Sequence, residues 1–326
     1  MTISRLMAKI LFACTSIALA FALAGCVREP ESPLRIGSNV WIGGEPLYLA
    51  RELGALDAGA VQLVEYPSAS EVLRAFRNQA IDGMVISLDE MLTLAADGLD
   101  PRIIVVIDIS HGADAVLGRA YMRSMQDLRD RPVAVEGGAL GAYMLSRALT
   151  LSGMQASDVR VIHLESNEQP AAFENGQVDG AVTFDPYRGQ LIRAGARTLF
   201  DSTHIPGEIV DVIAVRASVL GSHPHAIRGL LAGWFSATAY MAREPVDAAR
   251  RMAIRQQTTG EQFLSALGGL RIHTYEENLK LLAGGKPDLP VAARRLMDLM
   301  LEARLLRSAV DIDELLAPRP LEEMHR

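Results

Sequence analysis

The chain has almost no cysteine. Only two of its 326 residues are cysteine, Cys14 and Cys26, and both lie near the N-terminus. The body that follows residue 26 therefore contains none. A disulfide within that body and a metal site built on thiolates are both excluded.

Lysine is also scarce, since it occurs only at positions 9, 280 and 286. A Schiff-base enzyme needs a lysine, and these three lie at the N-terminus and in the predicted C-terminal helices. The GxSxG, P-loop and HExxH signatures of other enzyme classes are missing as well. His111 and His204 have no nucleophile pattern beside them. The sequence therefore argues against a catalytic role.

Positive charge and long apolar runs are both in short supply. The chain has 32 Lys and Arg against 39 Asp and Glu, for a formal net charge of −7. A net negative charge disfavours binding to the phosphate backbone of a nucleic acid, so we expect no nucleic-acid partner. Beyond residue 25, no apolar run approaches the length of a membrane span. We expect the body to lie outside the bilayer, attached only at its N-terminus.

The first residues have the pattern of an export signal. A short positive region precedes the apolar residues 10–23, and Leu23-Ala24-Gly25-Cys26 resembles the lipobox of bacterial lipoproteins. This resemblance implies cleavage before Cys26 and a lipid on its side chain. Residues 1–25 would then be a signal peptide and residues 26–33 a polar tether. The alternative is an ordinary signal peptide with an incidental cysteine.

One phrase occurs twice in the body. Residues 75–90 read AFRNQAIDGMVISLDE and residues 172–187 read AFENGQVDGAVTFDPY. The register is fixed, because 173 − 76 and 179 − 82 both equal 97. This period is too long for a solenoid and indicates two similar lobes. Chance similarity is the alternative, since Asp-Gly before a strand is common turn chemistry. The last four residues of each copy differ, and we expect these residues to contact the ligand and determine its specificity.

Short β-rich runs alternate with helical patterns around both copies. Predicted strands cover 34–42, 61–67, 82–87, 102–110, 131–138 and 159–165. Alternation of this kind predicts βαβ units and mainly parallel sheets. The segments 106–119 and 198–216 also match each other, and we place crossovers between the lobes near Ser110–Ala113 and Ile205–Glu208. Two crossing strands make a hinge, and a hinge between lobes makes a cleft.

These stretches resemble the type II periplasmic substrate-binding proteins, in particular the nitrate/sulfonate/taurine and thiamine-pyrimidine-precursor group of ABC-transporter binding lipoproteins. The resemblance is carried by the two copies and by LRIGSNVWIGGEPLYLARELGAL (34–56), VAVEGGALGAYMLSRAL (133–149) and GLRIHTYEENLKLL (269–282). It implies an α/β fold of two similar, doubly wound lobes joined by a two-strand hinge, with extra C-terminal helices. Lobe 1 would comprise 34–112 plus 208–326, and lobe 2 would comprise 113–207.

Ligands in open α/β sheets bind beyond the carboxyl ends of the strands. The candidates at these ends, with two near the crossovers, are Asn39, Trp41, Gly44, Ser68, Ser87, Asp89, His111, Glu136, Gly137, Gly138, Glu165, Asn167, Asp185, Tyr187 and Asp211. Trp41 could stack on a flat or cationic ligand or belong to the core. The serines and several acids could instead cap helices, and Trp234 at helical spacing indicates core.

No Arg or Lys falls at the ends of the predicted parallel strands, where an anion would need one. We therefore expect a small polar ligand that is neutral to cationic or heteroaromatic, bound with no cofactor and no metal. The resemblance implies delivery of this ligand to an ABC permease by a monomeric protein in the periplasm or at the cell surface, lipid-anchored through Cys26. The alternatives are a ligand sensor for a membrane receptor and, as an enzyme, a pyrimidine-synthesising relative. The tail after Val310 is expected to be one helical turn and a loose end.

Overall fold

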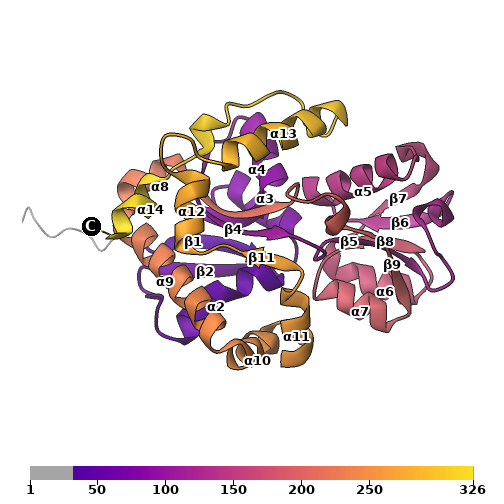
Figure 1. The fold of residues 1–326 in the computed structure, drawn as a ribbon, viewed down its shortest axis with the longest axis horizontal. Helices are drawn as coiled ribbons and strands as arrows, with labels where there is room; N and C mark the ends of the chain where they lie inside the picture. The colour runs from indigo at the N-terminus through magenta and orange to yellow at the C-terminus, as the bar shows by residue number, and fades with distance from the viewer. Residues whose placement is uncertain (1–31, 326) are drawn as a thin grey trace, which may run out of the picture. The chain divides into compact units, whose positions relative to one another are not determined.

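The computed structural model describes residues 32–325. The predicted signal peptide, Cys26 and most of the tether lie outside the described residues. Residues from Pro33 onward form one compact unit, which contains two β-sheets. In Figure 1 helices flank each of these sheets.

The first sheet has six strands. In spatial order they are β11 (Leu270–Ile272), β4 (Pro101–Ser110), β10 (Val210–Arg216), β3 (Gly83–Ser87), β1 (Leu34–Asn39) and β2 (Val61–Tyr66). β1 runs parallel to β2 and β3, whereas β10 is antiparallel to β3 and β4, and β11 is antiparallel to β4. The prediction of mainly parallel sheets is therefore wrong beyond the three leading strands. The reason is that β10 enters this sheet from the other lobe and runs in the opposite direction.

The second sheet repeats the order of the first. Its strands are β7 (Arg160–His163), β6 (Pro132–Val135), β8 (Gly180–Thr183), β5 (Ala115–Arg119) and β9 (Ala196–Asp201). β6 is parallel to β7 and β8, and β5 is antiparallel to β8 and β9. Ile36 pairs with Gly83 in the first sheet and Val133 with Gly180 in the second, so both partners are shifted by the same 97 positions. The internal repeat is confirmed at the level of strand register.

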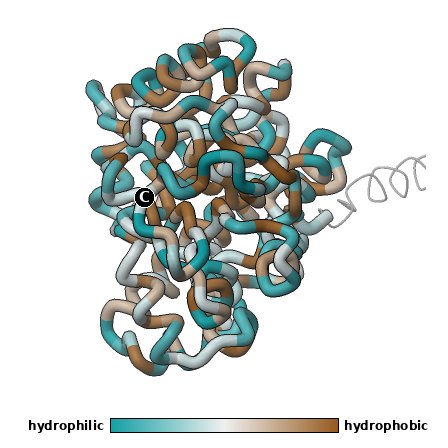
Figure 2. The backbone as a smooth tube through the Cα atoms, turned by 90° about the vertical axis from the view of Figure 1, so that its right-hand side faces the viewer, coloured by the Kyte–Doolittle hydropathy of each residue, from teal (hydrophilic) through white to brown (hydrophobic). Residues whose placement is uncertain are grey.

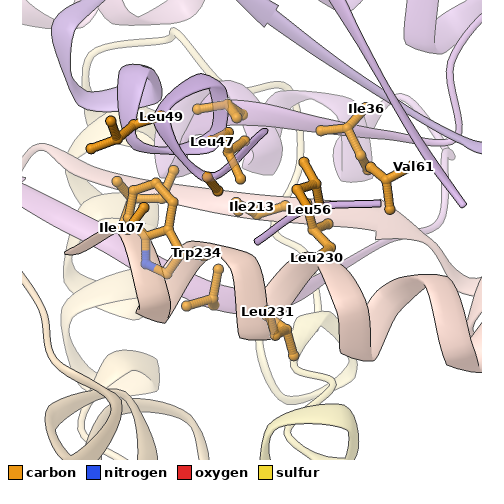
Figure 3. Close-up of a cluster of buried hydrophobic side chains, with 14 of the residues drawn as sticks. Ile36, Leu47, Leu49, Leu56, Val61, Ile107, Ile213, Leu230, Leu231 and Trp234 are labelled. Atoms are coloured by element: carbon orange, nitrogen blue, oxygen red, sulfur yellow. The ribbon is translucent and has the colours of Figure 1, made fainter. Parts of the chain in front are cut away.

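Both faces of the first sheet are covered by helices. One face packs against α2 (Glu45–Glu52), α9 (Pro224–Arg243), α10 (Pro245–Arg255) and α11 (Gly260–Leu267). The other packs against α3 (Ala69–Arg77), α4 (Leu88–Ala96), α12 (Tyr275–Leu282), α13 (Leu289–Glu302) and α14 (Arg319–Glu322). Figure 3 shows Trp234 of α9 among aliphatic side chains of the first face. Trp234 is fully buried, which confirms its predicted place in the core.

The second sheet is covered in the same manner. α5 (Ala139–Leu151) packs on one face, and α6 (Gln169–Glu174) and α7 (Tyr187–Arg193) pack on the other, as Figure 1 also shows. The short helix α8 (Ala217–Ser222) follows β10. In Figure 2 hydrophobic stretches run through the interior, and hydrophilic stretches lie at many outer turns. Between residues 32 and 325, no helix combines the length and apolarity that a membrane crossing needs.

An arginine ties each crossing strand into its new sheet. Arg119, at the end of β5, lies over the Phe173 ring at 4.0 Å and donates to the carbonyl oxygens of Phe173 and Val178. Arg216, at the end of β10, lies over the Phe76 ring at 3.9 Å and donates to the carbonyls of Phe76 and Ile81. The two arginines are themselves 97 positions apart. Each repeat thus contributes one strand and its arginine to the other lobe.

The chain crosses between the lobes at the two predicted places. The first crossover joins β4 to β5, and the second joins β9 to β10 through η5 (Ser202–His204). The hydroxyl oxygens of Ser110 and Ser202 lie 2.7 Å apart and link the two crossovers. Gly112 and Gly207, one in each crossover, have φ angles of 103° and 77°, in a region that favours glycine. These short segments are the hinge of the fold.

The C-terminal tail is not a loose end, so that expectation is wrong. The Ala317 amide donates to the carbonyl of Ile103 on β4, and Leu316 forms a β-bridge with the same residue. Leu315 and Leu321 are buried in the core on the α13 face of the first sheet. Two leucines and a backbone bridge therefore hold the tail against lobe 1.

Candidate ligand-binding cleft

Two small adjoining cavities lie where the two lobes meet. They share Ala69 and Glu90 from the first lobe, Leu140 and Phe184 from the second, and Asp114 from the first crossover. Their volumes are about 20 and 30 Å³, which is room for one or two waters each. The lobes are therefore closed on each other, and a larger ligand must enter by opening the hinge.

Six of the predicted site residues line these cavities. They are Asn39, Trp41, Ser87, Glu136, Gly138 and Asp211. Five of them come from the carboxyl ends of β1, β3 and β6, as the rule that places ligands beyond strand ends predicts. Asp211, a candidate because of its place near a crossover, comes from the start of β10. Whether they bind a ligand stays a prediction.

Trp41 lies at the boundary between cleft and core. Its side chain is buried in the core cluster on the α2 face and also lines the 30 Å³ cavity. Its ring covers Gly43 so closely that a Cβ there would overlap it. Phe184 of lobe 2 belongs to the same cluster and lines both cavities. Trp41 therefore belongs to the core, as one reading had it, and it also lines the cleft; its stacking on a ligand stays a prediction.

Five other predicted residues are at least half-buried nearby but line neither cavity. Ser68 caps α3 by accepting from the Glu71 amide, as its alternative reading had it. Gly44 lies at the start of α2. Asp89 lies in the first turn of α4. Asp185 accepts from the Gly189 amide of α7 at 3.1 Å. Tyr187 packs edge-to-face on Phe184.

Three predicted residues are exposed and line neither cavity. His111 lies in the first crossover, Gly137 follows β6, and Asn167 lies in the short helix η4 (Ser166–Glu168). No atom lies within 4 Å of the Cβ position of Gly137. A place near a strand end or a crossover is therefore not sufficient to bring a residue into the cleft.

Several cleft residues were missed by the sequence prediction. Glu90 lines both cavities, whereas its chosen neighbour Asp89 lines neither. Asp114 lies in the crossover, just before β5, and Thr183 ends β8. Phe184 stands 97 positions after Ser87, so the repeat itself could have identified it: both residues line the cleft.

Hydrogen bonds fasten the two lobes across the cleft. The Ser70 amide of α3 donates to Glu136 Oε1 at 3.0 Å, and the Ser70 hydroxyl donates to Glu165 Oε2 at 2.6 Å. The other carboxyl oxygen of Glu136 accepts from the Ser166 hydroxyl. Opposite them, Glu90 of lobe 1 lies so close to Gly138 that a Cβ at position 138 would overlap its carboxyl group. Because this group is the far end of a flexible side chain, a small residue at position 138 would displace it, whereas a bulky residue would hold the lobes apart.

A second set of contacts holds the second crossover, between β9 and β10, to lobe 2. Glu208 accepts from the Tyr143 hydroxyl at 2.6 Å and from Arg147 Nε at 2.7 Å. Burial opposes the charge of Glu208, but these hydrogen bonds outweigh burial and hold its pKa below the ordinary value. Glu208 is therefore ionised when the lobes are closed.

The cleft is surrounded by buried carboxyl groups. Burial is the main cause that raises the pKa of Asp89 to about 7 and of Asp114 to about 6. Burial also raises the pKa of Glu136, and it raises that of Glu90, Asp108 and Asp211 well above the ordinary range, with repulsion between neighbouring acids adding to it. Asp108 and Asp211 pair directly across β4 and β10, where like charges repel.

These acids do not form a metal centre. Among residues 32–325, no three His, Cys, Asp or Glu side chains come together in an arrangement that could hold a metal ion. Two larger hollows of the described chain lie elsewhere. One is a mostly apolar groove of about 540 Å³ lined by α9, α10, α11 and α12, and the other, of about 610 Å³, is lined by α8, α9 and the C-terminal tail. Neither hollow contains a predicted site residue.

Comparison with known proteins identifies relatives along most of the chain. The model of the NMT1-like family matches residues 28–256. A candidate aliphatic sulfonates-binding protein of Escherichia coli K12 is 28% identical over 225 residues, which is 65% of this chain and 67% of the relative.

Solved structures share the fold. The alkanesulfonate-binding protein SsuA of Xanthomonas axonopodis, bound to MOPS, has a TM-score of 0.75 at 19% identity and covers 88% of this chain and 98% of its own. The desulfurization enzyme DSZB has a TM-score of 0.68 at 16% identity, with 90% of this chain and all of the enzyme chain covered. At such identities the likeness establishes the two-lobed architecture alone.

Proposed function

The chain belongs to the NMT1-like family, and on that premise we propose that it is an extracytoplasmic solute-binding protein that captures a small polar molecule between its lobes and delivers it to an ABC permease. The observation that carries the proposal is the pair of matched sheets joined by two short crossovers, with side chains of both lobes meeting at Ser70, Glu136 and Glu165. Such a fold closes on a ligand, and a partner can sense the closed form.

The relatives support this assignment. The similar Escherichia coli protein is described as a binding protein, and SsuA of Xanthomonas is a solved alkanesulfonate-binding protein of the same fold. We assign residues 34–112 plus 208–326 to lobe 1 and 113–207 to lobe 2, acting as a monomer. We also assign the protein to the periplasm or cell surface, anchored by a lipid on Cys26.

We propose binding rather than catalysis, although DSZB shows that this fold also supports an enzyme. Within the described residues, lysine occurs only at Lys280 and Lys286. Both are exposed, and neither lines the cleft. A lysine nucleophile is therefore not placed where the ligand would bind.

A bulky side chain at position 138 tests the proposed function. Gly138→Trp would meet Glu90 when the lobes close, so we expect this variant to be held open, with a larger radius of gyration by small-angle scattering than the wild type. It should unfold at a similar temperature yet lose ligand-dependent stabilisation. As a matched control, Gly137→Trp adds the same side chain where no atom lies within 4 Å. Equal scattering and equal ligand binding by both variants would contradict closure on a solute.

A further inference from the structure

The lining of the cleft is acidic. Four carboxyl groups line the two cavities, Glu90, Asp114, Glu136 and Asp211, and none of the described lining residues is Lys, Arg or His. Proteins recognise sulfonates, phosphates and carboxylates with Arg, Lys or groups of N–H donors. The side chains around these cavities are of the opposite kind.

The helix N-termini at the cleft do not compensate for this lack. The first amides of α3 are directed at Glu136, which accepts from the Ser70 amide, and Glu90 lies against Gly138 at the start of α5. Helix N-termini are natural anion sites. Here the carboxylates of the chain occupy those positions, so an incoming anion would have to displace them.

An unsatisfied polar atom adds a second, independent observation. Thr183 is almost fully buried, lines the 20 Å³ cavity, and its hydroxyl has no hydrogen-bond partner among the described residues. A buried polar group without a partner is costly, and a polar group of a ligand in this cavity would supply the hydrogen bond that the Thr183 hydroxyl lacks.

We propose that the ligand is a small organic cation, a protonated amine or amidinium, whose charge is held by Glu90, Asp114 and Asp211 while its apolar part lies against Trp41 and Phe184. This inference rests on the proposed solute-binding function and names the chemical class of the solute. Both aromatic rings line the cavity that Glu90, Asp114 and Asp211 also line. Aromatic faces attract cations in addition to burying apolar surface.

The basic side chains around the cleft already have acidic partners. Arg188 pairs with Asp185 at 3.7 Å, Arg147 with Glu208 at 2.7 Å, and Arg255 with Glu45 at 3.2 Å. Asp114 is partly neutralised by Arg188, whose Nε is buried without a hydrogen-bond partner in the described structure. At Glu90 and Asp211, burial and repulsion from neighbouring acids dominate. A cation that enters the cleft would neutralise these two acids.

Cation binding should also release protons. The titratable or charged groups that act on one another here are Asp89 and Glu90 on α4, Asp108 on β4, Asp114 in the crossover, Glu136 after β6, Tyr143 on α5, Asp185 and Arg188 around the start of α7, and Asp211 on β10. Acids dominate this set. A cation favours their ionised forms, so its affinity should rise as the pH rises from about 5 to about 8.

The test uses ligand pairs that share a shape and differ in the sign of their charge. The probes are butylamine against butanesulfonate, and benzylamine and benzamidine against benzenesulfonate. Each is added at up to about 10 mM, which detects even millimolar affinity, and is scored by thermal shift and then by calorimetry. We expect at least one amine or amidine to bind and neither sulfonate to do so. Calorimetry in two buffers of different ionisation enthalpy should show proton release with the cation.

Two isosteric variants locate the charge. Glu90→Gln and Asp114→Asn should each weaken cation binding by about tenfold to a hundredfold, the usual worth of a hydrogen bond to a charged group. Glu174→Gln, at an exposed position of α6, removes the same charge away from the cleft and should leave the affinity unchanged. Equal affinity in wild type and both cleft variants would overturn the proposal.

The two proposals fail in different ways. Binding of a sulfonate and of no amine or amidine, abolished by Gly138→Trp, would overturn the cationic ligand and leave the solute-binding function standing. Binding of a cation that Gly138→Trp does not affect would place the cation outside the cleft and overturn the assignment. Failure of every probe, whatever its charge, would count against the cationic ligand and the solute-binding function together.

Discussion

Replacing Asp114 by asparagine should stabilise the protein, and it should do so only at neutral and alkaline pH. Asp114 is buried in the first crossover, and burial raises its pKa from 3.8 to about 6. The asparagine side chain has nearly the same shape and cannot ionise. The substitution therefore isolates the free energy of holding this one charge in the folded protein.

The sign follows from proton binding. In the unfolded chain an aspartate titrates near pH 4, whereas the folded protein holds the Asp114 proton up to about pH 6. Between these values the folded state binds more protons, so stability from this group is complete below about pH 4 and is lost as the pH rises through about 6. A tenfold change in proton affinity is worth about 1.4 kcal/mol, which gives a penalty of about 3 kcal/mol at pH 8.

Chemical unfolding followed by the fluorescence of Trp41 and Trp234 measures this effect. We expect Asp114→Asn to raise the free energy of unfolding by up to about 3 kcal/mol at about pH 8 and by almost nothing at about pH 4. Glu174→Gln, exposed on α6, should change stability at neither pH. The reasoning is refuted if Asp114→Asn gains the same amount at both pH values, or loses stability at pH 8.

Three further predictions concern the fold and its anchor. Arg119→Met and Arg216→Met should each destabilise the protein by about 2–4 kcal/mol, since each loses hydrogen bonds to two carbonyls and a ring contact. Urea unfolding, with Arg197→Ala as the control at an exposed site, measures this loss of stability. Unchanged stability in both variants would show that these arginines do not hold the crossing strands in place. Leu321→Ala should lower the free energy of unfolding by about 2–5 kcal/mol, because this tail residue is fully buried. An unchanged unfolding midpoint would indicate that the tail is loose after all. Cys26→Ser should move the protein from the membrane fraction to the soluble fraction, and loss of a lipid mass by mass spectrometry should accompany the change; membrane retention would disprove the anchor.

The sequence was most informative where local pattern and long-range structure coincide. The repeated phrase predicted two lobes of the same design, and the shared strand order and the 97-residue shift of Ile36–Gly83 to Val133–Gly180 confirm it. Strand runs and turn residues fix such features locally. The direction of the remaining strands in each sheet cannot be read from the local sequence. It depends on β5 and β10 exchanging lobes, which no propensity encodes.

The cleft was predicted in outline but not in detail. The strand-end rule identifies Asn39, Trp41 and Ser87, yet it favours Asp89 over Glu90. Adjacent helix residues point about 100° apart, so only the docked orientation of α4 decides which acid faces the cleft. Asp114 escaped notice for a related reason, because the path of a crossover is set by the two sheets that it joins.

The place of the acids in the fold connects ligand charge to lobe closure. Asp108 and Asp211 lie opposite each other on β4 and β10, and Asp114 lies in the crossover itself. Glu90 and Glu136 make contacts that exist only while the lobes are closed. Closure therefore costs free energy, because these acids must either hold protons or repel one another, and the two crossovers are the segments that move when the lobes open. A bound cation removes that repulsion and favours the closed form by its differential affinity. The same buried acids that destabilise the folded chain at neutral pH would thus couple closure to the ligand, because its positive charge offsets their cost.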